Sequence, residues 1–131
     1  MYRGAILNSD INRIARNLGH TDQLCIADCG LPIPPQTEKV DLALKPGTPG
    51  FWEVLTEVSD HLEVERITLA EEIREYNAPL YQMLCERLQD IPMELIPHEA
   101  FKQQTAHCAA VIRTGEVRPY ANIILHSGCL F

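Results

Sequence analysis

The stretch Gln23-Leu24-Cys25-Ile26-Ala27-Asp28 is a nearly continuous apolar run that ends in a carboxylate, and Cys29-Gly30-Leu31-Pro32-Ile33-Pro34-Pro35 follows it directly. Short apolar runs of this kind are typical of strands that are covered on both faces of a sheet. The prolines exclude a helix after the run, because each fixes its own φ and pushes the preceding residue towards extended geometry. We therefore expect a buried strand over 23–28 that leads into a rigid loop.

The segments around this strand alternate between helical and strand patterns. Before it, apolar residues at helical spacing predict a helix over 9–18, which Asn8 or Ser9 can cap at its start. Gly19 can end this helix in the left-handed conformation. Further helices are predicted over 51–59, 71–76, 78–89 and 98–107, and further strands over 40–44, 64–70, 93–96, 109–113 and 122–126.

This alternation predicts an α/β fold in which helices cover a largely parallel or mixed sheet. We find no linker, so residues 1–131 are expected to form a single domain. Open sheets of this class bind ligands at the carboxyl ends of their strands. Asp28, at the end of the first predicted strand, lies where that rule places a site.

The composition excludes several classes of function. The net charge is −7, from 11 basic and 18 acidic residues, whereas nucleic-acid binding needs a dense cationic surface. No apolar run is long enough to span a membrane, and residues 1–10 lack the apolar region of a signal peptide. The five cysteines are widely spaced and form no CxxC pair, so neither a disulfide framework nor a cysteine-based zinc site is expected. We expect a cytoplasmic protein that binds a neutral small molecule, without nucleic acid or membrane.

The common cofactor and metal motifs are missing from the sequence. It has no GxGxxG, no GxxxxGK[ST] and no HExxH, and its histidines at 20, 61, 98, 107 and 126 form no short ligand cluster. A nucleophile elbow of the GxSxG type is missing as well. We expect no cofactor and no metal, although a histidine site assembled by the fold stays open. The chemistry left to ordinary side chains is proton transfer.

His20 is the first candidate for that chemistry. It follows the predicted helix end and lies in the polar stretch Gly19-His20-Thr21-Asp22. Histidine has an ordinary pKa of about 6.5, which suits it to move protons near neutral pH. A loop histidine is more often solvated and idle, so the pattern alone leaves both interpretations open.

The other candidates are polar residues at the ends of predicted elements. Asp28 can either brace its loop or accept a hydrogen bond from a ligand hydroxyl. His98 and Lys102 are four residues apart and would share one helix face, which is equally typical of surface display. Tyr120 and Asn122 lie in a polar connection before the last predicted strand, where a turn or hairpin is the simpler explanation.

Read together, several stretches of the chain resemble the family of ribose pyranases and fucose mutarotases. The matching stretches are 7–10, 18–22, 28–34, 41–44, 70–73, 98–99 with 101–102, 110–116 and 119–125. The order of the stretches and the chain length agree with the family as well. The Gly19–Asp22 and Leu31–Pro34 stretches are more similar to the ribose branch than to the fucose branch.

This resemblance implies a fold, an activity and a set of site residues. The activity would be the cofactor-independent interconversion of the pyranose and furanose forms of D-ribose. His20 matches the family's catalytic histidine, and Asp28, His98 and the stretch Tyr120-Ala121-Asn122 match its sugar-binding positions. Lys102 is added because it shares a helix face with His98. The family also implies a homo-oligomer, a decamer of two stacked pentameric rings with sites at the subunit interfaces.

Three alternatives stay open at this stage. The first is a mutarotase for fucose or another monosaccharide, which needs a different pocket around the same chemistry. The second is a non-catalytic sugar-binding or transport-associated subunit, because the same polar residues could serve binding alone. The third is a histidine-based metalloenzyme. Sugar-ring exchange measured over a panel of sugars, ribose affinity and metal analysis separate them.

Overall fold

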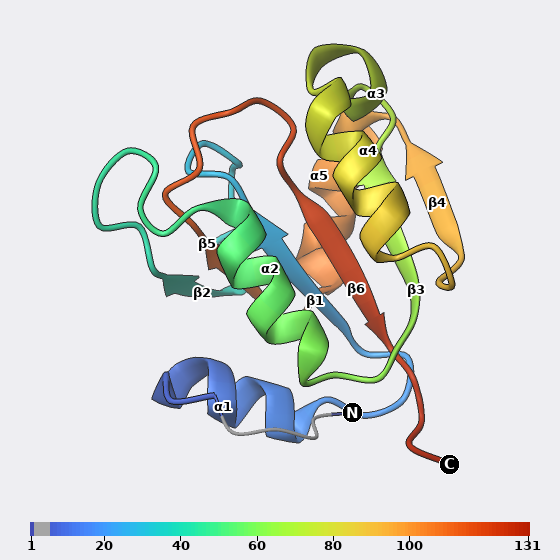
Figure 1. Ribbon diagram of the computed structural model, residues 1–131. Coiled ribbons are helices and arrows are strands. Elements are labelled where there is room, and N and C mark those ends of the chain that lie inside the picture. Colours follow the sequence, from blue (N-terminus) through green and yellow to red (C-terminus); the bar gives the residue numbers. More distant parts are fainter. Residues whose placement is uncertain (2–5) are drawn as a thin grey trace.

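The computed structural model describes residue 1 and residues 6–131. Within that range six strands form one sheet in the order β2-β5-β1-β6-β3-β4 (Figure 1). The strands are β1 (Gln23–Ala27), β2 (Glu38–Asp41), β3 (Val64–Ala70), β4 (Met93–Ile96), β5 (Ala110–Arg113) and β6 (Ile123–Ser127). The pairs β2·β5, β5·β1 and β3·β4 are parallel, whereas β6 runs antiparallel to both of its neighbours. The predicted α/β fold with a mixed sheet is confirmed.

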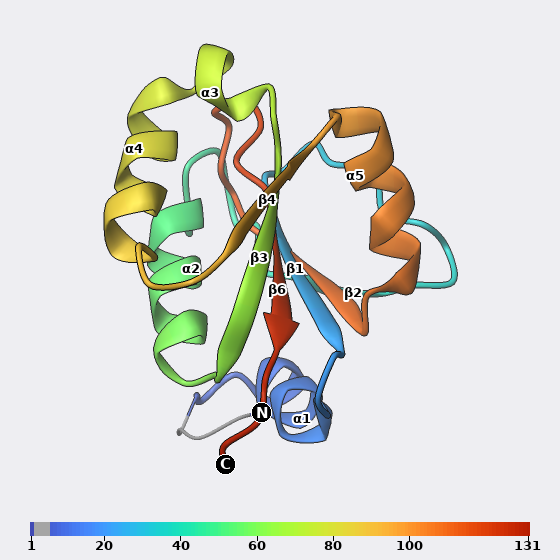
Figure 2. The same cartoon turned by 90° about the vertical axis from the view of Figure 1, so that its right-hand side faces the viewer.

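Helices lie on both faces of the sheet and at one of its ends. Seen along the sheet, α2 (Phe51–Asp60), α3 (Ile73–Tyr76) and α4 (Ala78–Arg87) lie on one side and α5 (His98–Gln104) on the other (Figure 2). A 3₁₀ turn, η1 (Thr105–His107), extends α5. The helix α1 (Ser9–Asn17) lies at the end of the sheet where both termini are found.

Strand β1 explains why both faces need a cover. Its successive side chains point to opposite faces, so Leu24 and Ile26 pack with the helices α1, α2 and α4 in the larger core. Cys25 and Ala27 pack instead against Phe101 of α5 in a smaller core on the opposite face. The apolar run over 24–27 is therefore buried on both faces of the sheet, as the sequence predicts.

Several local predictions need correction, among them the strand predicted over 40–44, which is β2 over Glu38–Asp41. Asn8 does cap α1, since its Oδ1 accepts the Ile11 N–H at 3.0 Å, but the helix ends at Asn17 and Leu18 is already extended. The left-handed residue in this turn is Thr21, with φ 75°, and not Gly19. No hairpin joins the last two strands, because β1 lies between β5 and β6.

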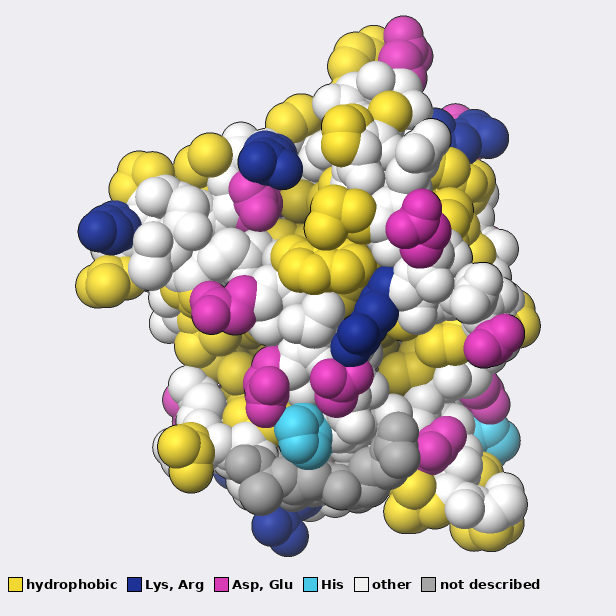
Figure 3. Space-filling model, viewed as in Figure 1, with side chains coloured by type: hydrophobic (Ala, Val, Ile, Leu, Met, Phe, Trp, Pro, Cys, Tyr) yellow, Lys and Arg dark blue, Asp and Glu magenta, His cyan; other side chains and the backbone are white. Residues whose placement is uncertain are grey.

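The described surface fits the charge pattern in the sequence. On the face shown in Figure 3, Lys and Arg side chains stand singly among Asp and Glu, and hydrophobic side chains gather between α2 and α4. Among the described helices, none has the length and apolar character that crossing a bilayer requires. Residues 2–5, part of the N-terminal stretch in which no signal peptide is expected, lie outside the described residues.

Candidate functional site

The carboxyl end of β1 opens onto a cavity of about 300 Å³. Its lining comes from three parts of the chain: the loop after β1, the start of α5 and the connection that leads into β6. The lining residues are Asp28, Gly30, Leu31, Pro32, His98, Pro119, Tyr120 and Asn122. Because β6 is antiparallel to β1, the beginning of β6 lies beside the end of β1, and residues 94 positions apart meet there.

Asp28 and Asn122 form the polar base of this cavity. Asn122 Oδ1 accepts the Asp28 backbone N–H at 2.8 Å, and Asn122 Nδ2 donates to Asp28 Oδ2 at 3.2 Å. Asp28 Oδ1 accepts the Gly30 N–H at 3.0 Å, so the carboxylate also braces its loop. Burial raises the pKa of the Asp28 carboxyl, and the hydrogen bonds from Gly30, Asn122 and Leu31 oppose that rise. A carboxylate has roughly four acceptor positions, so these three donors leave room for one from a ligand.

His98 and Tyr120 form an aromatic corner of the cavity. Their ring centroids lie 5.0 Å apart in an edge-on arrangement, and the Phe101 ring is nearly parallel to the His98 ring at 6.4 Å. His98 Nδ1 is buried and has no hydrogen-bond partner. Both carboxylate oxygens of Glu72 lie within reach of the His98 backbone N–H, at 3.0 and 3.1 Å, and fix the start of α5.

Tyr120 is held in a costly backbone conformation. Its φ is 57°, in the left-handed region that residues with a side chain rarely adopt. Such a conformation costs roughly 1–2 kcal/mol and persists where surrounding contacts impose it. Its ring is thereby aimed at His98. The cavity thus offers a carboxylate, an amide, an imidazole and a phenol ring, a set suited to a ligand with several hydroxyl groups and apolar C–H faces.

His20 lies at the opposite end of β1, away from this cavity. Its Nε2 is 2.9 Å from Glu65 Oε2 on β3, and its side chain is 52% exposed. The turn that carries it is tied to the end of β6, where the Thr21 N–H donates to the Ser127 carbonyl. The five residues of β1 alone separate the two ends by about 15 Å. Within one chain, His20 and the Asp28 cavity therefore do not meet.

Two further residues singled out in the sequence do not line the cavity. Lys102 lies one turn after His98 on α5, and its Nζ pairs with Glu99 Oε1 at 2.8 Å. Ala121 is fully buried in the larger core, between Tyr120 and Asn122. The structure thus brings together Asp28, His98, Tyr120 and Asn122 around the cavity, and His20, Lys102 and Ala121 do not line it.

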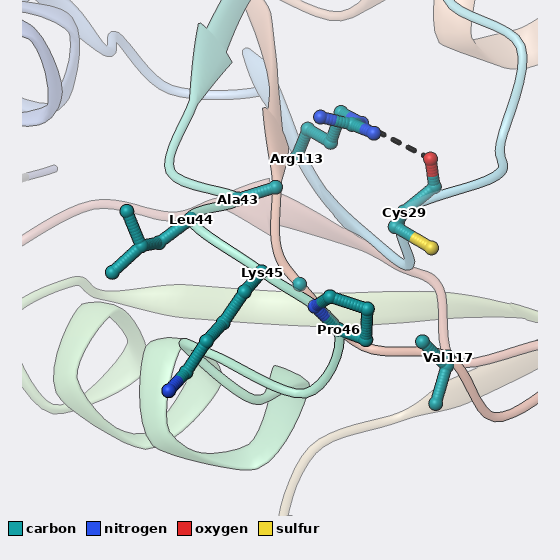
Figure 4. A pocket seen from close by; sticks show the side chains of 8 residues that line it. Cys29, Ala43, Leu44, Lys45, Pro46, Arg113 and Val117 are labelled. Carbon is teal, nitrogen blue, oxygen red and sulfur yellow. Dashed lines mark hydrogen bonds between the residues drawn. The ribbon is translucent and has the colours of Figure 1, made fainter.

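The loop after β1 also lines a second pocket (Figure 4). It is bounded by Cys29, Ala43, Leu44, Lys45, Pro46, Arg113, Gly115 and Val117. Its two cations do not converge: Arg113 donates to the Cys29 carbonyl at 3.0 Å and pairs with Asp41, and the Lys45 side chain points away from Arg113. In the part of the chain that the structure describes, no group of three His, Cys, Asp or Glu side chains could hold a metal ion. Because the two cations of the second pocket do not converge, the Asp28 cavity is the better candidate.

Several residues at these sites were not singled out in the sequence. Glu65 faces His20, and Glu72 holds the start of α5, each across more than 20 positions of sequence. Glu72 lies in the matching stretch 70–73, but its contact with His98 was not predicted, and no local pattern marks Glu65. Both contacts come from the packing of strands and helices. Pro119 lines the cavity next to Tyr120, and its position beside that candidate was the available signal.

The chain is similar to known proteins over its whole length. The sequence model of the RbsD / FucU transport protein family matches residues 1–130. A D-ribose pyranase of Staphylococcus haemolyticus is 50% identical over 131 residues, which is all of both chains. A structure of Bacillus subtilis RbsD complexed with D-ribose is 43% identical, with a TM-score of 0.96 over all of both chains. FucU from Bifidobacterium longum is 26% identical, with a TM-score of 0.74 over 95% of this chain and 97% of that one.

Proposed function

Because the chain belongs to the RbsD / FucU family, we propose that it is a D-ribose pyranase, an isomerase that interconverts the pyranose and furanose forms of D-ribose. The observation that carries this proposal is the full-length match to the RbsD structure complexed with D-ribose. Identity is also higher to that RbsD, 43%, than to the FucU structure, 26%, which favours ribose over fucose. Residues 1–131 would act as one sugar-isomerase unit.

The reaction requires two coordinated proton transfers. A cyclic sugar opens when its ring oxygen gains a proton, its anomeric hydroxyl loses one and the bond from the anomeric carbon to the ring oxygen breaks. Closure through a different hydroxyl gives the other ring size. The reaction proceeds spontaneously in water, so proton transfer by positioned side chains, worth roughly 10²- to 10⁴-fold, accelerates it without a covalent nucleophile.

In this proposal His20 donates the proton to the ring oxygen, and the cavity holds the sugar. Asp28 accepts a hydrogen bond from a sugar hydroxyl, while His98 and the stretch Tyr120-Ala121-Asn122 contact the rest of the ring. The Glu65 carboxylate, 2.9 Å from His20 Nε2, orients the imidazole. A second group, directly or through water, takes the anomeric proton. Lys102, one turn along α5 from His98, is the least supported member of the set.

The placement of His20 supports a site shared between subunits. The half-exposed imidazole and the cavity lie at opposite ends of β1, so one chain cannot bring both to one sugar. A head-to-tail contact between copies joins unlike ends, and it forms a ring when the rotation between neighbours closes. We therefore infer a homo-oligomer in which His20 of one subunit completes the cavity of its neighbour. The form of that oligomer, a decamer of two stacked pentameric rings, is what the family resemblance implies. The five cysteines are free thiols, which is typical of proteins in the reducing cytoplasm, and we propose that location for this protein.

Saturation-transfer NMR on ribose tests the activity directly. The wild-type protein is expected to accelerate exchange between ring forms, and His20→Ala is expected to lose that acceleration by roughly 10²-fold or more while its fold is retained. His61→Ala is the matched control, since His61 is also a histidine beside a carboxylate, Glu57, at 3.6 Å. Undiminished exchange in His20→Ala contradicts the role of His20. Ribose binding without exchange in the wild type supports a binding subunit instead, and faster exchange of fucose supports a mutarotase.

Mixed oligomers test whether the site is shared. His20→Ala and Asn122→Ala are each expected to be inactive as pure proteins. Co-expressed in equal amounts, they are expected to regain about one quarter of the wild-type rate, because a quarter of the interfaces pair an intact His20 with an intact cavity. The double variant His20→Ala/Asn122→Ala mixed with inactive His20→Ala is the control. If mixing restores no activity, the two halves do not come from different subunits.

A further inference from the structure

A short segment over the cavity contacts both of its aromatic residues. Residues 72–77, here called the α3 brace, include α3 and the junction to α4. In Figures 1 and 2 this segment lies beside the connection that leads into β6. At one end of the brace Glu72 binds the backbone of His98, and at the other end Tyr76 and Asn77 contact the stretch that carries Tyr120.

Asn77 connects the brace to the residue before Tyr120. Its side chain is 6% exposed, and its Nδ2 donates to the Pro119 carbonyl at 3.0 Å. The backbone of Asn77 is used by the helices on either side: its N–H donates to the Ile73 carbonyl, and its carbonyl accepts the Tyr81 N–H. The backbone of Asn77 is therefore held on both sides by helical hydrogen bonds. Its side-chain amide binds the Pro119 carbonyl from this rigid position.

Tyr76 contacts the ring of Tyr120 itself. The two ring centroids are 5.7 Å apart with an angle of 37° between the planes. Tyr76 is 59% exposed, which is unusual for a large aromatic residue that serves only the core. Tyr120 therefore has an aromatic partner in each of two helices, Tyr76 in α3 and His98 in α5.

The geometry points to Tyr76 and Asn77 as positioning residues that hold Tyr120 ready for the sugar. This inference rests on the proposed function, in which Tyr120 contacts ribose. Asn122 fixes the connection on the far side of Tyr120 through Asp28, and the brace fixes it on the near side. If the left-handed Tyr120 is populated only in part, the apparent affinity for sugar falls by the same fraction. Loss of the brace contacts thus raises KM and leaves kcat unchanged.

The exposed residue gives the cleaner experiment. The rate of ring-form exchange is measured as a function of ribose concentration for the wild type, Tyr76→Ala, Tyr76→Phe and Met83→Ala. Tyr76→Ala is expected to raise KM about three- to tenfold with kcat within about twofold. Tyr76→Phe keeps the ring and is expected to match the wild type. Met83→Ala removes an exposed apolar side chain from the neighbouring helix α4 and is the control.

Several outcomes would overturn the inference. An unchanged KM in Tyr76→Ala excludes a positioning role. An equal rise of KM in Tyr76→Phe or Met83→Ala shows that the contact between the two rings is not the cause. Asn77→Ala is expected to raise KM in the same way. Because Asn77 is buried, circular dichroism checks that this variant folds. If the Asn77→Ala variant does not fold, Tyr76→Ala decides the question.

The result separates this inference from the proposed function. If the wild-type protein binds ribose without accelerating exchange, the proposed function is wrong and the variants are compared by calorimetry. A dissociation constant about three- to tenfold higher in Tyr76→Ala alone then supports the positioning role, and equal constants overturn it. A wild-type protein that neither exchanges nor binds ribose overturns both.

Discussion

At the scale of single residues, one glycine is required by the close approach of two backbone segments. A Cβ on Gly115 would lie 2.5 Å from the Thr48 carbonyl oxygen and 2.7 Å from that of Lys45. The Gly115 N–H also donates to the Pro49 carbonyl at 2.8 Å, so the neighbouring loop cannot move away without losing that bond. These contacts hold the loop over 45–49 against the end of β5.

We predict that Gly115→Ala destabilises the protein by about 1–3 kcal/mol, because backbone atoms must shift to admit the methyl group. The midpoint of urea unfolding measures this loss at fixed protein concentration. Gly19→Ala is the matched control, since the atom nearest to its new Cβ would be a side-chain oxygen of Asp22 at an ordinary 3.6 Å. Equal stability of the two variants would contradict the packing described for Gly115.

The site residues show how far single positions can be predicted from sequence. Asp28, His98, Tyr120 and Asn122 were all singled out, and the structure places them around one cavity. The strained φ of Tyr120 and the hydrogen bond from Asn77 to Pro119 were not foreseen, because both depend on contacts between distant segments. The pairing of His20 with Glu65 was not foreseen for the same reason.

At the scale of elements, local signals predicted the beginning of α1 better than its end. The polar side chain of Asn8 satisfies a free N–H of the first turn, and this needs only neighbouring residues. The predicted end is one residue too long, because Leu18 is extended and its N–H donates to the Ala15 carbonyl. Gly19 is not left-handed, so it does not end the helix in the way the sequence predicts.

We predict that Asn8→Ala lowers the free energy of unfolding by about 1 kcal/mol through loss of this cap. Thermal or urea unfolding followed by circular dichroism measures the change. Asn8→Asp keeps an acceptor at the same place and adds a charge that favours a helix N-terminus, so it is expected to retain the wild-type stability. An Asn8→Ala variant as stable as the Asn8→Asp variant would show that the cap contributes nothing.

At the scale of the whole molecule, the order of the strands could not be predicted from the sequence. Helix and strand patterns gave the fold class, since periodicity is a local property. Strand pairing is not a local property. Strand β6 lies between β1 and β3, and its register with β1 pairs Leu24 with Leu125 and Ile26 with Ile123. Such contacts between residues about a hundred positions apart are decided by burial of the whole sheet, which no short window contains.

A buried histidine in β6 makes the stability of the molecule depend on pH. His126 is 2% exposed, and its Nε2 lies 2.8 Å from the Thr68 hydroxyl. Burial lowers the pKa of His126, with Arg66 acting in the same direction and Glu94 and Glu65 opposing. The unfolded chain therefore binds more protons than the folded one below about pH 6.5, the ordinary value.

We predict that the free energy of unfolding falls as the pH is lowered from 7.5 to 5. This window runs through the ordinary pKa of histidine towards the lowered pKa of His126 in the folded protein. His126 contributes a slope of at most about 1.4 kcal/mol per pH unit. Urea unfolding at several pH values measures the slope. His126→Gln has no titrating group and is expected to be flatter, whereas exposed His107→Gln is expected to follow the wild type. Identical slopes in the wild type and His126→Gln would show that His126 is not the titrating group.

The central place of β6 has a consequence for how the protein is made. The ribosome synthesises β6 after the other five strands, yet without it the sheet divides into β2-β5-β1 and β3-β4. The emerging chain thus exposes unpaired edges of β1 and β3 until residue 127 has left the exit tunnel. Tyr120 and Asn122 arrive with that same strand. Translation therefore completes the sheet, and supplies three of the eight residues that line the cavity, in one late step.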